Sequence, residues 1–199
     1  MPFEITNFSI SPHQKNTFVK PVQLQYSQNG EQRTWEAVKS HDSVSVLLYH
    51  RDKKAFLLVR QFRPPVYMNH RKHTSTYELC AGIVDKKVSL KQIACEEIDE
   101  ECGYDVPLKN IKKISSFFTN VGVTGSRQDV FYATINDAMQ VHAGGGIHNE
   151  QIELEYIPLN EARDFLFNED LAKTPGLMFA FYWFFEHCGN DGQKLSIDE

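Results

Sequence analysis

The sequence lacks the features that mark membrane and secreted proteins. Its N-terminus has no basic stretch followed by an apolar one, so we expect no signal peptide. The longest apolar run, residues 177–185, is too short to span a bilayer and is better explained by core or dimer packing. Four cysteines show neither C-x-x-C spacing nor the density of a disulfide-stabilised scaffold. These absences predict a cytoplasmic protein with reduced thiols and no membrane partner.

An excess of basic charge is also missing. The chain of 199 residues has 21 basic and 26 acidic side chains, and its formal net charge is -5. This mild acidity argues against a nucleic-acid partner, because proteins that bind nucleic acids usually carry a basic face. The whole imbalance comes from five acidic residues: Glu96, Glu97, Asp99, Glu100 and Glu101. Without them, 21 acidic residues face 21 basic ones.

The remaining composition is that of a globular protein, with 41% apolar residues and 14 Phe, 8 Tyr and 2 Trp. Alternating or β-branched segments predict strands at 3–10, 17–26, 32–38, 43–49, 55–62, 74–79, 111–118, 129–135 and 152–157. Helical patterns occur at 89–102, 160–167 and 174–187. This order predicts an α/β (α+β) protein, an α-β-α sandwich with a mixed sheet. We expect an N-terminal antiparallel β segment at 1–40 and one domain at 41–199.

Local signals set several of these boundaries. Asn29-Gly30 is typical of a two-residue hairpin turn. Ser89 begins a capping-box pattern, and Gly103 is a natural helix stop. Thr174 followed by Pro175 is typical of the start of a helix.

The expected helix at 89–102 carries carboxylates on its apolar face. Helical spacing places four apolar residues on one stripe: Leu90, Ile93, Ala94 and Ile98. Glu97 and Glu101 fall within that stripe, one turn apart, and Glu100 lies at its edge. Buried like charges need a positive partner, and the helix has no basic residue after Lys91. Either oxygen ligands bind Mg²⁺ or Mn²⁺ here, or this is a solvated, purely structural acidic face.

The acidic run belongs to a longer pattern. Gly82 is followed at fixed spacing by Glu97, Ile98, Glu100, Glu101 and Gly103, with Tyr104 as a looser match. This arrangement resembles the Nudix box, G-x5-E-x7-R-E-U-x-E-E-x-G-U, in which U is apolar. Val88 and Glu96 replace the Glu and Arg that typically pair in the family. The resemblance implies the Nudix fold, with local loop packing altered at these two positions.

Three further segments resemble nucleoside diphosphate-sugar pyrophosphatases. Residues 78–85 are similar to their E-L-P-A-G-x-x-D segment, with Cys80 in place of Pro, and residues 59–65 to their Q-F-R-P strand. Residues 120–128 resemble the V-G-x-T-G-S-R-Q pattern of the animal UDP-glucose pyrophosphatase branch. The resemblance implies Mg²⁺-dependent hydrolysis of UDP-glucose to UMP and glucose 1-phosphate. ADP-ribose hydrolysis and a non-catalytic nucleotide-sugar-binding module are the alternatives.

The resemblance also assigns the metal ligands. Glu97 and Glu101 would bind the cation directly, and the Ala81 carbonyl would add one oxygen. Glu100 would be a ligand or would support one, and Glu100 and Glu101 would be catalytic. Arg63 matches the family's phosphate-contacting Arg, whose planar fork suits phosphate; otherwise it is a surface Arg at a strand end.

The remaining candidates lie outside the box. Glu78 would orient Arg63 or contact the substrate, unless it is only a strand-end carboxylate. A carboxylate on a late loop often acts as general base in the family, which indicates Glu150, with Glu153 next. His148 stands where relatives often carry another acid, and Glu150 could instead be merely solvated.

The N-terminal segment is assigned by resemblance to a homodimer contact. In related diphosphatases this region exchanges between subunits, and its aromatic residues stack on the base. Trp35 is therefore a candidate substrate contact, although core or dimer packing explains it equally well. Gly125, Ser126 and Arg127 would contact the sugar or uracil, or form a plain hairpin turn.

Overall fold

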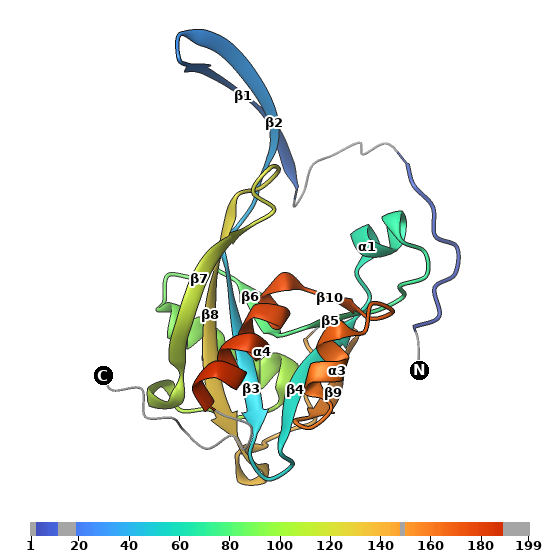
Figure 1. Cartoon of the computed structure of the whole chain (residues 1–199), viewed down its shortest axis with the longest axis vertical. Coiled ribbons are helices and arrows are strands. Elements are labelled where there is room, and N and C mark those ends of the chain that lie inside the picture. The colour runs from blue at the N-terminus through green and yellow to red at the C-terminus, as the bar shows by residue number, and fades with distance from the viewer. Residues whose placement is uncertain (1–2, 12–18, 148–149, 189–199) are drawn as a thin grey trace.

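The computed structural model describes residues 3–11, 19–147 and 150–188 (Figure 1). The first two residues of the predicted strand 17–26, and His148, lie outside the described residues. The strands are β1 (Lys20–Gln28), β2 (Glu31–Lys39), β3 (Ser43–His50), β4 (Ala55–Gln61), β5 (Thr76–Glu78), β6 (Cys80–Ile83), β7 (Lys112–Thr119), β8 (Ser126–Ile135), β9 (Ile152–Pro158) and β10 (Ala172–Lys173). The helices are α1 (Pro64–Asn69), α2 (Leu90–Glu97), α3 (Ala162–Phe167) and α4 (Pro175–Cys188), with a π-helical turn η1 (Ile98–Cys102) and the 3₁₀ turns η2 (Leu108–Asn110) and η3 (Asp137–Met139).

The main sheet is mixed and forked. Its order is β10-β5-β4-β3-β8-β7, with β6 also pairing with β3 and β9 with β4. β3 and β4 pair only near their hairpin, over 48–50 and 55–57. Beyond that point β3 pairs with β6 and β4 pairs with β5, so the chain crosses the fork at Leu79. The fork therefore places Glu78 and Ala81 on either side of one gap between the strands.

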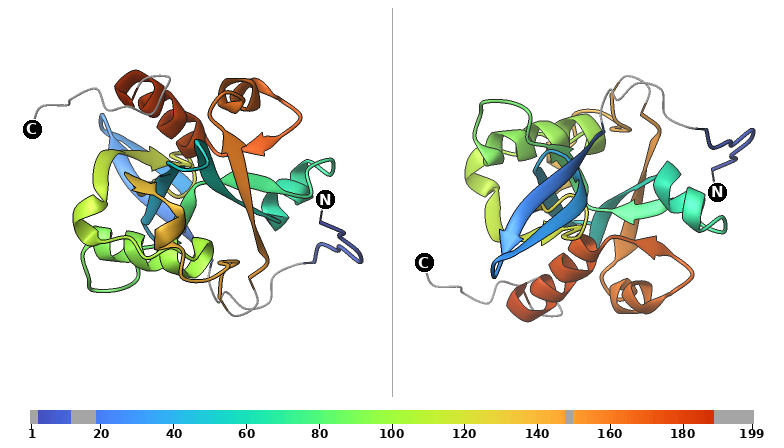
Figure 2. Two further views of the ribbon diagram at one scale, coloured as in Figure 1. Left: turned by 90° about the horizontal axis from the view of Figure 1, so that it is seen from below. Right: turned by 90° about the horizontal axis from the view of Figure 1, so that it is seen from above.

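Helices cover both faces of this sheet (Figure 2). Alternate residues of β3 point to opposite sides: Val46 and Leu48 join the core under α2 and η1, and Leu47 and Tyr49 join the core under α3 and α4. All four are buried, as expected for a strand covered on both faces. The predicted α-β-α sandwich is confirmed, and the aromatic residues of α4 include Phe181 and Phe184 in its second core.

The N-terminal hairpin projects from the domain. β1 and β2 form a separate two-stranded antiparallel sheet, which extends beyond the main sheet in Figure 1. Its turn has the predicted residues, and Asn29 (φ 55°) and Gly30 (φ 85°) both adopt the left-handed conformation that a type I′ turn requires. The predicted strand at 3–10 is wrong, because residues 3–11 pair with no strand. Phe8 instead packs edge-on against Tyr67 of α1.

Several predicted boundaries are confirmed. The Ser89 hydroxyl accepts a hydrogen bond from the Gln92 amide at 3.1 Å, and Gly103 ends η1 with φ 77°. The Leu177 amide donates to the Thr174 hydroxyl at 3.4 Å, which caps α4. All four cysteines are free thiols. In the part of the chain that the structure describes, no helix is long and apolar enough to cross a membrane.

Candidate active site

Two glutamates on consecutive turns face the inside of the domain. α2 leads into η1, and η1 carries Glu101, of which 6% is exposed. The Glu101 Oε2 accepts a hydrogen bond from the Ala81 amide at 2.9 Å. Burial raises the pKa of Glu101 to about 8, although the Ala81 hydrogen bond opposes the shift. Burial, followed by the charge of Glu100, raises the pKa of Glu97 to about 7.

Gly82 explains how Glu97 reaches this position. A Cβ atom on Gly82 would lie 1.9 Å from the Glu97 Oε1, so any side chain there would displace the carboxylate. The first glycine of the motif is therefore required by the close approach of a side chain and not by its backbone angles. The strand β6 thus contacts Glu97 through Gly82 and Glu101 through the Ala81 amide.

Arg63 lies beside this pair of carboxylates. Its Nε and Nη2 donate to the two oxygens of Glu78 at 2.7 and 2.8 Å. These bonds raise the pKa of Arg63, and the charges of Glu101 and Glu150 add to the effect. Glu78 therefore contacts the Arg63 guanidinium through both carboxylate oxygens, the arrangement that the first of its two predicted roles requires. The Arg63 side chain remains 46% exposed, so its guanidinium can also contact an anion from solvent.

Glu150 faces the same group of charges. Its Oε2 accepts a hydrogen bond from the Ile147 amide at 3.1 Å, and its charge raises the pKa of both Glu97 and Glu101. The other candidate base, Glu153, is placed differently, since it forms an ion pair with Arg60 on the neighbouring strand. Of the two, the structure brings only Glu150 into the electrostatic reach of the helix glutamates.

The glycine-rich loop at 144–146 is hydrogen-bonded to the backbone of η1, which carries Glu100 and Glu101. The sequence analysis did not predict this contact. Gly145 and Gly146 donate backbone hydrogen bonds to the carbonyls of Glu101 (2.8 Å) and Glu100 (3.2 Å). A Cβ atom on Gly144 would lie 2.5 Å from the Glu101 carbonyl oxygen. The signal was the run of three glycines, all of which adopt positive φ. The loop at 144–146 therefore packs against η1.

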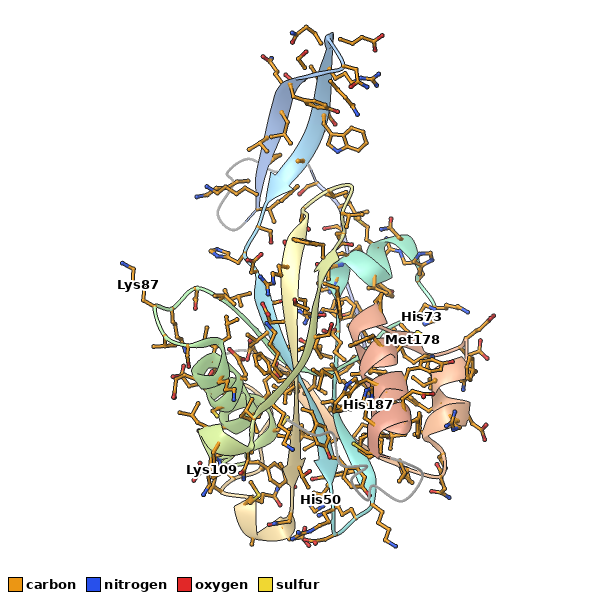
Figure 3. The ribbon with its side chains drawn as sticks, turned by 60° about the vertical axis from the view of Figure 1, so that its left-hand side comes forward. His50, His73, Lys87, Lys109, Met178 and His187 are labelled. Atoms are coloured by element: carbon orange, nitrogen blue, oxygen red, sulfur yellow. The ribbon has the colours of Figure 1, made fainter. Side chains whose placement is uncertain are left out.

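The candidate ligands are of the chemical type that suits a divalent cation. Their side-chain oxygens, however, do not form a group of three within 4.8 Å of one another. Carboxylates and a backbone carbonyl are the oxygen ligands that Mg²⁺ and Mn²⁺ prefer. Among the described residues, ligand atoms converge within 4.8 Å in another place, at His50, Asp52 and Asp137. That group lies at the opposite end of the sheet from the hairpin (Figure 3), and the Lys53 ammonium lies 2.5 Å from Asp137.

The two departures from the motif are compensated locally. Glu96 forms an ion pair with Lys86 at 2.7 Å and accepts a hydrogen bond from Gln92. Val88 is exposed. The family's Glu–Arg pair is therefore replaced by a Lys–Glu pair of reversed polarity, two residues earlier in the loop. The Lys86 charge also reaches Glu97, where it lowers the pKa and so opposes the larger effect of burial.

The remaining predicted residues form a second group at the base of the hairpin. The Trp35 indole donates to the Gly122 carbonyl at 2.9 Å, and Gly125 (φ 59°) belongs to the same β7–β8 turn. Arg127 pairs with the buried Asp129 at 3.1 Å. Ser126 begins β8. Among the described contacts, none joins these residues to the helix glutamates.

A substitution at Gly82 tests the ligand position. Gly82→Ala is expected to leave the fold intact, because the flexible Glu97 side chain can swing away, but to weaken Mn²⁺ binding by roughly 10- to 100-fold. Calorimetric titration measures the affinity. Gly122→Ala is the matched control, since a Cβ atom there meets nothing within 4 Å. Equal affinities in the two variants would contradict the placement of Glu97.

The raised pKa values predict how stability depends on pH without metal. Because the folded pKa values (about 7 and about 8) exceed the unfolded value near 4.5, the folded state retains protons that the unfolded state releases. In EDTA, the free energy of unfolding should therefore fall between about pH 5 and pH 8 by the order of a few kcal/mol. Urea denaturation measures the slope, which Glu101→Gln should flatten. An unchanged slope in that variant would contradict the assignment.

Comparisons with known proteins agree with this geometry. The model of the NUDIX domain matches residues 39–176. The uridine diphosphate glucose pyrophosphatases NUDT14 of Bos taurus and Mus musculus are each 36% identical over 196 residues, covering 84% of this chain and 88% of theirs. A GDP-mannose pyrophosphatase of Pectobacterium atrosepticum is 34% identical over 121 residues, covering 61% of each chain.

A solved structure agrees with the fold. The crystal structure of an ADP compounds hydrolase superposes with a TM-score of 0.70, covering 90% of this chain and 91% of the other at 15% identity. At this identity the likeness concerns the fold alone. The domain match and the curated relatives, however, cover most of the sequence. The chain belongs to the Nudix hydrolase family.

Proposed function

We propose that the protein hydrolyses the pyrophosphate bond of a nucleoside diphosphate sugar, with UDP-glucose as the preferred substrate and UMP and glucose 1-phosphate as products. The observation that carries the proposal is the pair formed by the half-buried Glu97 and the buried Glu101, beside the Arg63–Glu78 ion pair. Relatives at 36% identity are named UDP-glucose pyrophosphatases, and others GDP-mannose pyrophosphatases. This supports a nucleotide sugar as the substrate class.

The cofactor is proposed to be Mg²⁺, with Mn²⁺ as a substitute. Glu97, Glu101 and the Ala81 carbonyl would hold it, with Glu100 as a further ligand or a support. When bound, such a cation supplies positive charge for phosphate oxygens and lowers the pKa of water. Glu97 and Glu101 must lose their protons to act as ligands, so metal binding is favoured at higher pH.

The protein's own groups then position the substrate. Arg63 is held by Glu78 and presents its free N–H groups to a phosphate, which orients the diphosphate. Glu150 is proposed as the general base. Its single described hydrogen bond, from the Ile147 amide, leaves further lone pairs to accept a proton from water.

The hairpin is proposed to join two copies of the chain in a cytoplasmic homodimer. Val22, Leu24 and Tyr26 alternate along β1, and Trp35 lies opposite Leu24, so one face of the ribbon carries four exposed apolar side chains. A two-stranded ribbon is marginally stable alone, and contiguous apolar patches mark interaction sites. In such a dimer Trp35 would pack at the interface or contact the base, and the 125–127 turn would contact the nucleotide or sugar.

Hydrolysis assays test the activity. With Mg²⁺, the protein should hydrolyse UDP-glucose faster than ADP-ribose, and Glu101→Gln should lower kcat by at least about a hundredfold. Glu150→Gln should also lower kcat by about a hundredfold or more while changing Mn²⁺ affinity far less than Glu101→Gln does. Glu96→Gln, on the solvent side of the same helix, is the control and should retain activity. Full activity of the Glu101 variant would refute the metal site, and equal or reversed substrate preference would refute the choice of UDP-glucose.

Two substitutions that add a carboxylate, one on each face of the hairpin, test whether the apolar face forms the dimer interface. Leu24→Glu should convert the dimer to a monomer, because it places a carboxylate in the apolar stripe. Gln25→Glu adds the same charge on the opposite face and should leave the dimer intact. Sedimentation equilibrium gives the mass of each variant. A monomeric wild-type protein, or two dimeric variants, would count against the proposed interface.

A further inference from the structure

A small cavity adjoins the candidate active site on the other face of the sheet. It lies where the N-terminus of α4 meets β3, β6 and β8, and its volume is about 40 Å³. Its polar lining comes from Ser45, Glu78, Gln128 and Thr174, and the rest of the wall from Leu79, Ala81, Gly176 and Leu177. A cavity of this size holds about three water-sized groups. Glu78 also pairs with Arg63, and the Ala81 amide with Glu101, so the cavity shares two of its lining residues with the candidate active site.

Ser45 carries the strongest signal in this cavity. Only 2% of the residue is exposed, and its hydroxyl has no hydrogen-bond partner among the described residues. It interrupts an otherwise apolar run of β3, where Val44, Val46 and Leu47 are all buried. Leaving a buried hydroxyl unpaired costs about 1–3 kcal/mol. An occupant that forms a hydrogen bond with Ser45 would remove this cost.

The first turn of α4 adds polar groups to the same cavity. Amides in the first turn of a helix have no partner within the helix and carry a partial positive charge. Thr174 caps the Leu177 amide, and Gly176 lies so close to Gln128 that a Cβ atom would be 2.6 Å from its Oε1. The absence of a side chain at Gly176 therefore preserves both the cavity and the position of the Gln128 amide.

The chemistry of this lining favours hydroxyl groups over an anion. No Lys or Arg lines the cavity, while the Glu78 carboxylate does, and it would repel a phosphate. Ser45 and Gln128 can each both donate and accept hydrogen bonds. Sugar hydroxyls have the same dual capacity, and two or three of their heavy atoms would fill the available volume.

We propose that this cavity binds hydroxyl groups of the glycosyl unit and that Ser45 and Gln128 help to determine sugar specificity. The inference rests on the proposed function, because the sugar must be attached to a diphosphate held at Ala81 and Arg63. The nucleoside would then lie on the other side of the diphosphate, away from α4.

Product binding tests the proposal separately from catalysis. Calorimetry on the full chain with Mg²⁺ would compare glucose 1-phosphate, inorganic phosphate and UMP. Ser45→Ala removes the buried hydroxyl, and Gly176→Ala places a methyl group against Gln128. Each should weaken glucose 1-phosphate binding by roughly 5- to 10-fold and leave phosphate and UMP binding unchanged. Ser115→Ala, a partly buried serine on β7, is the matched control and should behave as wild type.

The possible results separate the two claims. Selective weakening of glucose 1-phosphate supports the cavity as the sugar site, even if UDP-glucose is not hydrolysed, in which case only the proposed function fails. Unchanged binding would mean that the cavity holds only water and would overturn the inference. Failure of the wild type to bind glucose 1-phosphate, or an equal loss for phosphate or UMP, would overturn it as well.

Discussion

Two carboxylates on the inward face of one helix, Glu101 buried and Glu97 half-buried, are the constraint around which the rest of the site is arranged. An isolated buried charge is unfavourable, and two on adjacent turns repel each other. The domain offers Glu101 one backbone amide, from Ala81, and offers Glu97 the space left by Gly82. Arg63 supplies the nearby positive charge but is shared with Glu78. The local protein groups compensate these charges only in part, as the raised pKa values of both carboxyls indicate.

The forked sheet is what allows both of its faces to serve one site. Where β3 and β4 separate, β5 ends at Glu78 and β6 begins at Cys80, so one short stretch of chain contacts both helical layers. The glutamates approach from α2 and η1 on one side, and the N-terminus of α4 approaches from the other (Figure 2). The α2 and η1 side carries carboxylates, while the α4 side adds the neutral polar groups of Ser45, Gln128 and Thr174 to the Glu78 carboxylate.

Patterns that act within a few residues were readable from the sequence. The Ser89 cap, the Gly103 stop and the Asn29-Gly30 turn all appear as expected. Features that depend on distant partners were not. The strand β6 exists because Ala81 pairs with Ser45, and α1 interrupts a segment read only as a strand end. The predicted strand at 3–10 failed because alternation gives no information about whether a pairing partner is present. The Lys86–Glu96 pair was hidden for a similar reason, since the sequence shows the loss of one ion pair but not its replacement.

The central claim is that Glu97 and Glu101 bind the metal, and proton release measures this most directly. At pH 7 both carboxyls are partly protonated without a cation, because burial raises the pKa values to about 7 and about 8. Binding must displace those protons. Calorimetric titration of Mn²⁺ in buffers of different ionisation enthalpy should therefore report about one proton or more released at pH 7 and almost none near pH 9. Binding at pH 7 without proton release would contradict the account.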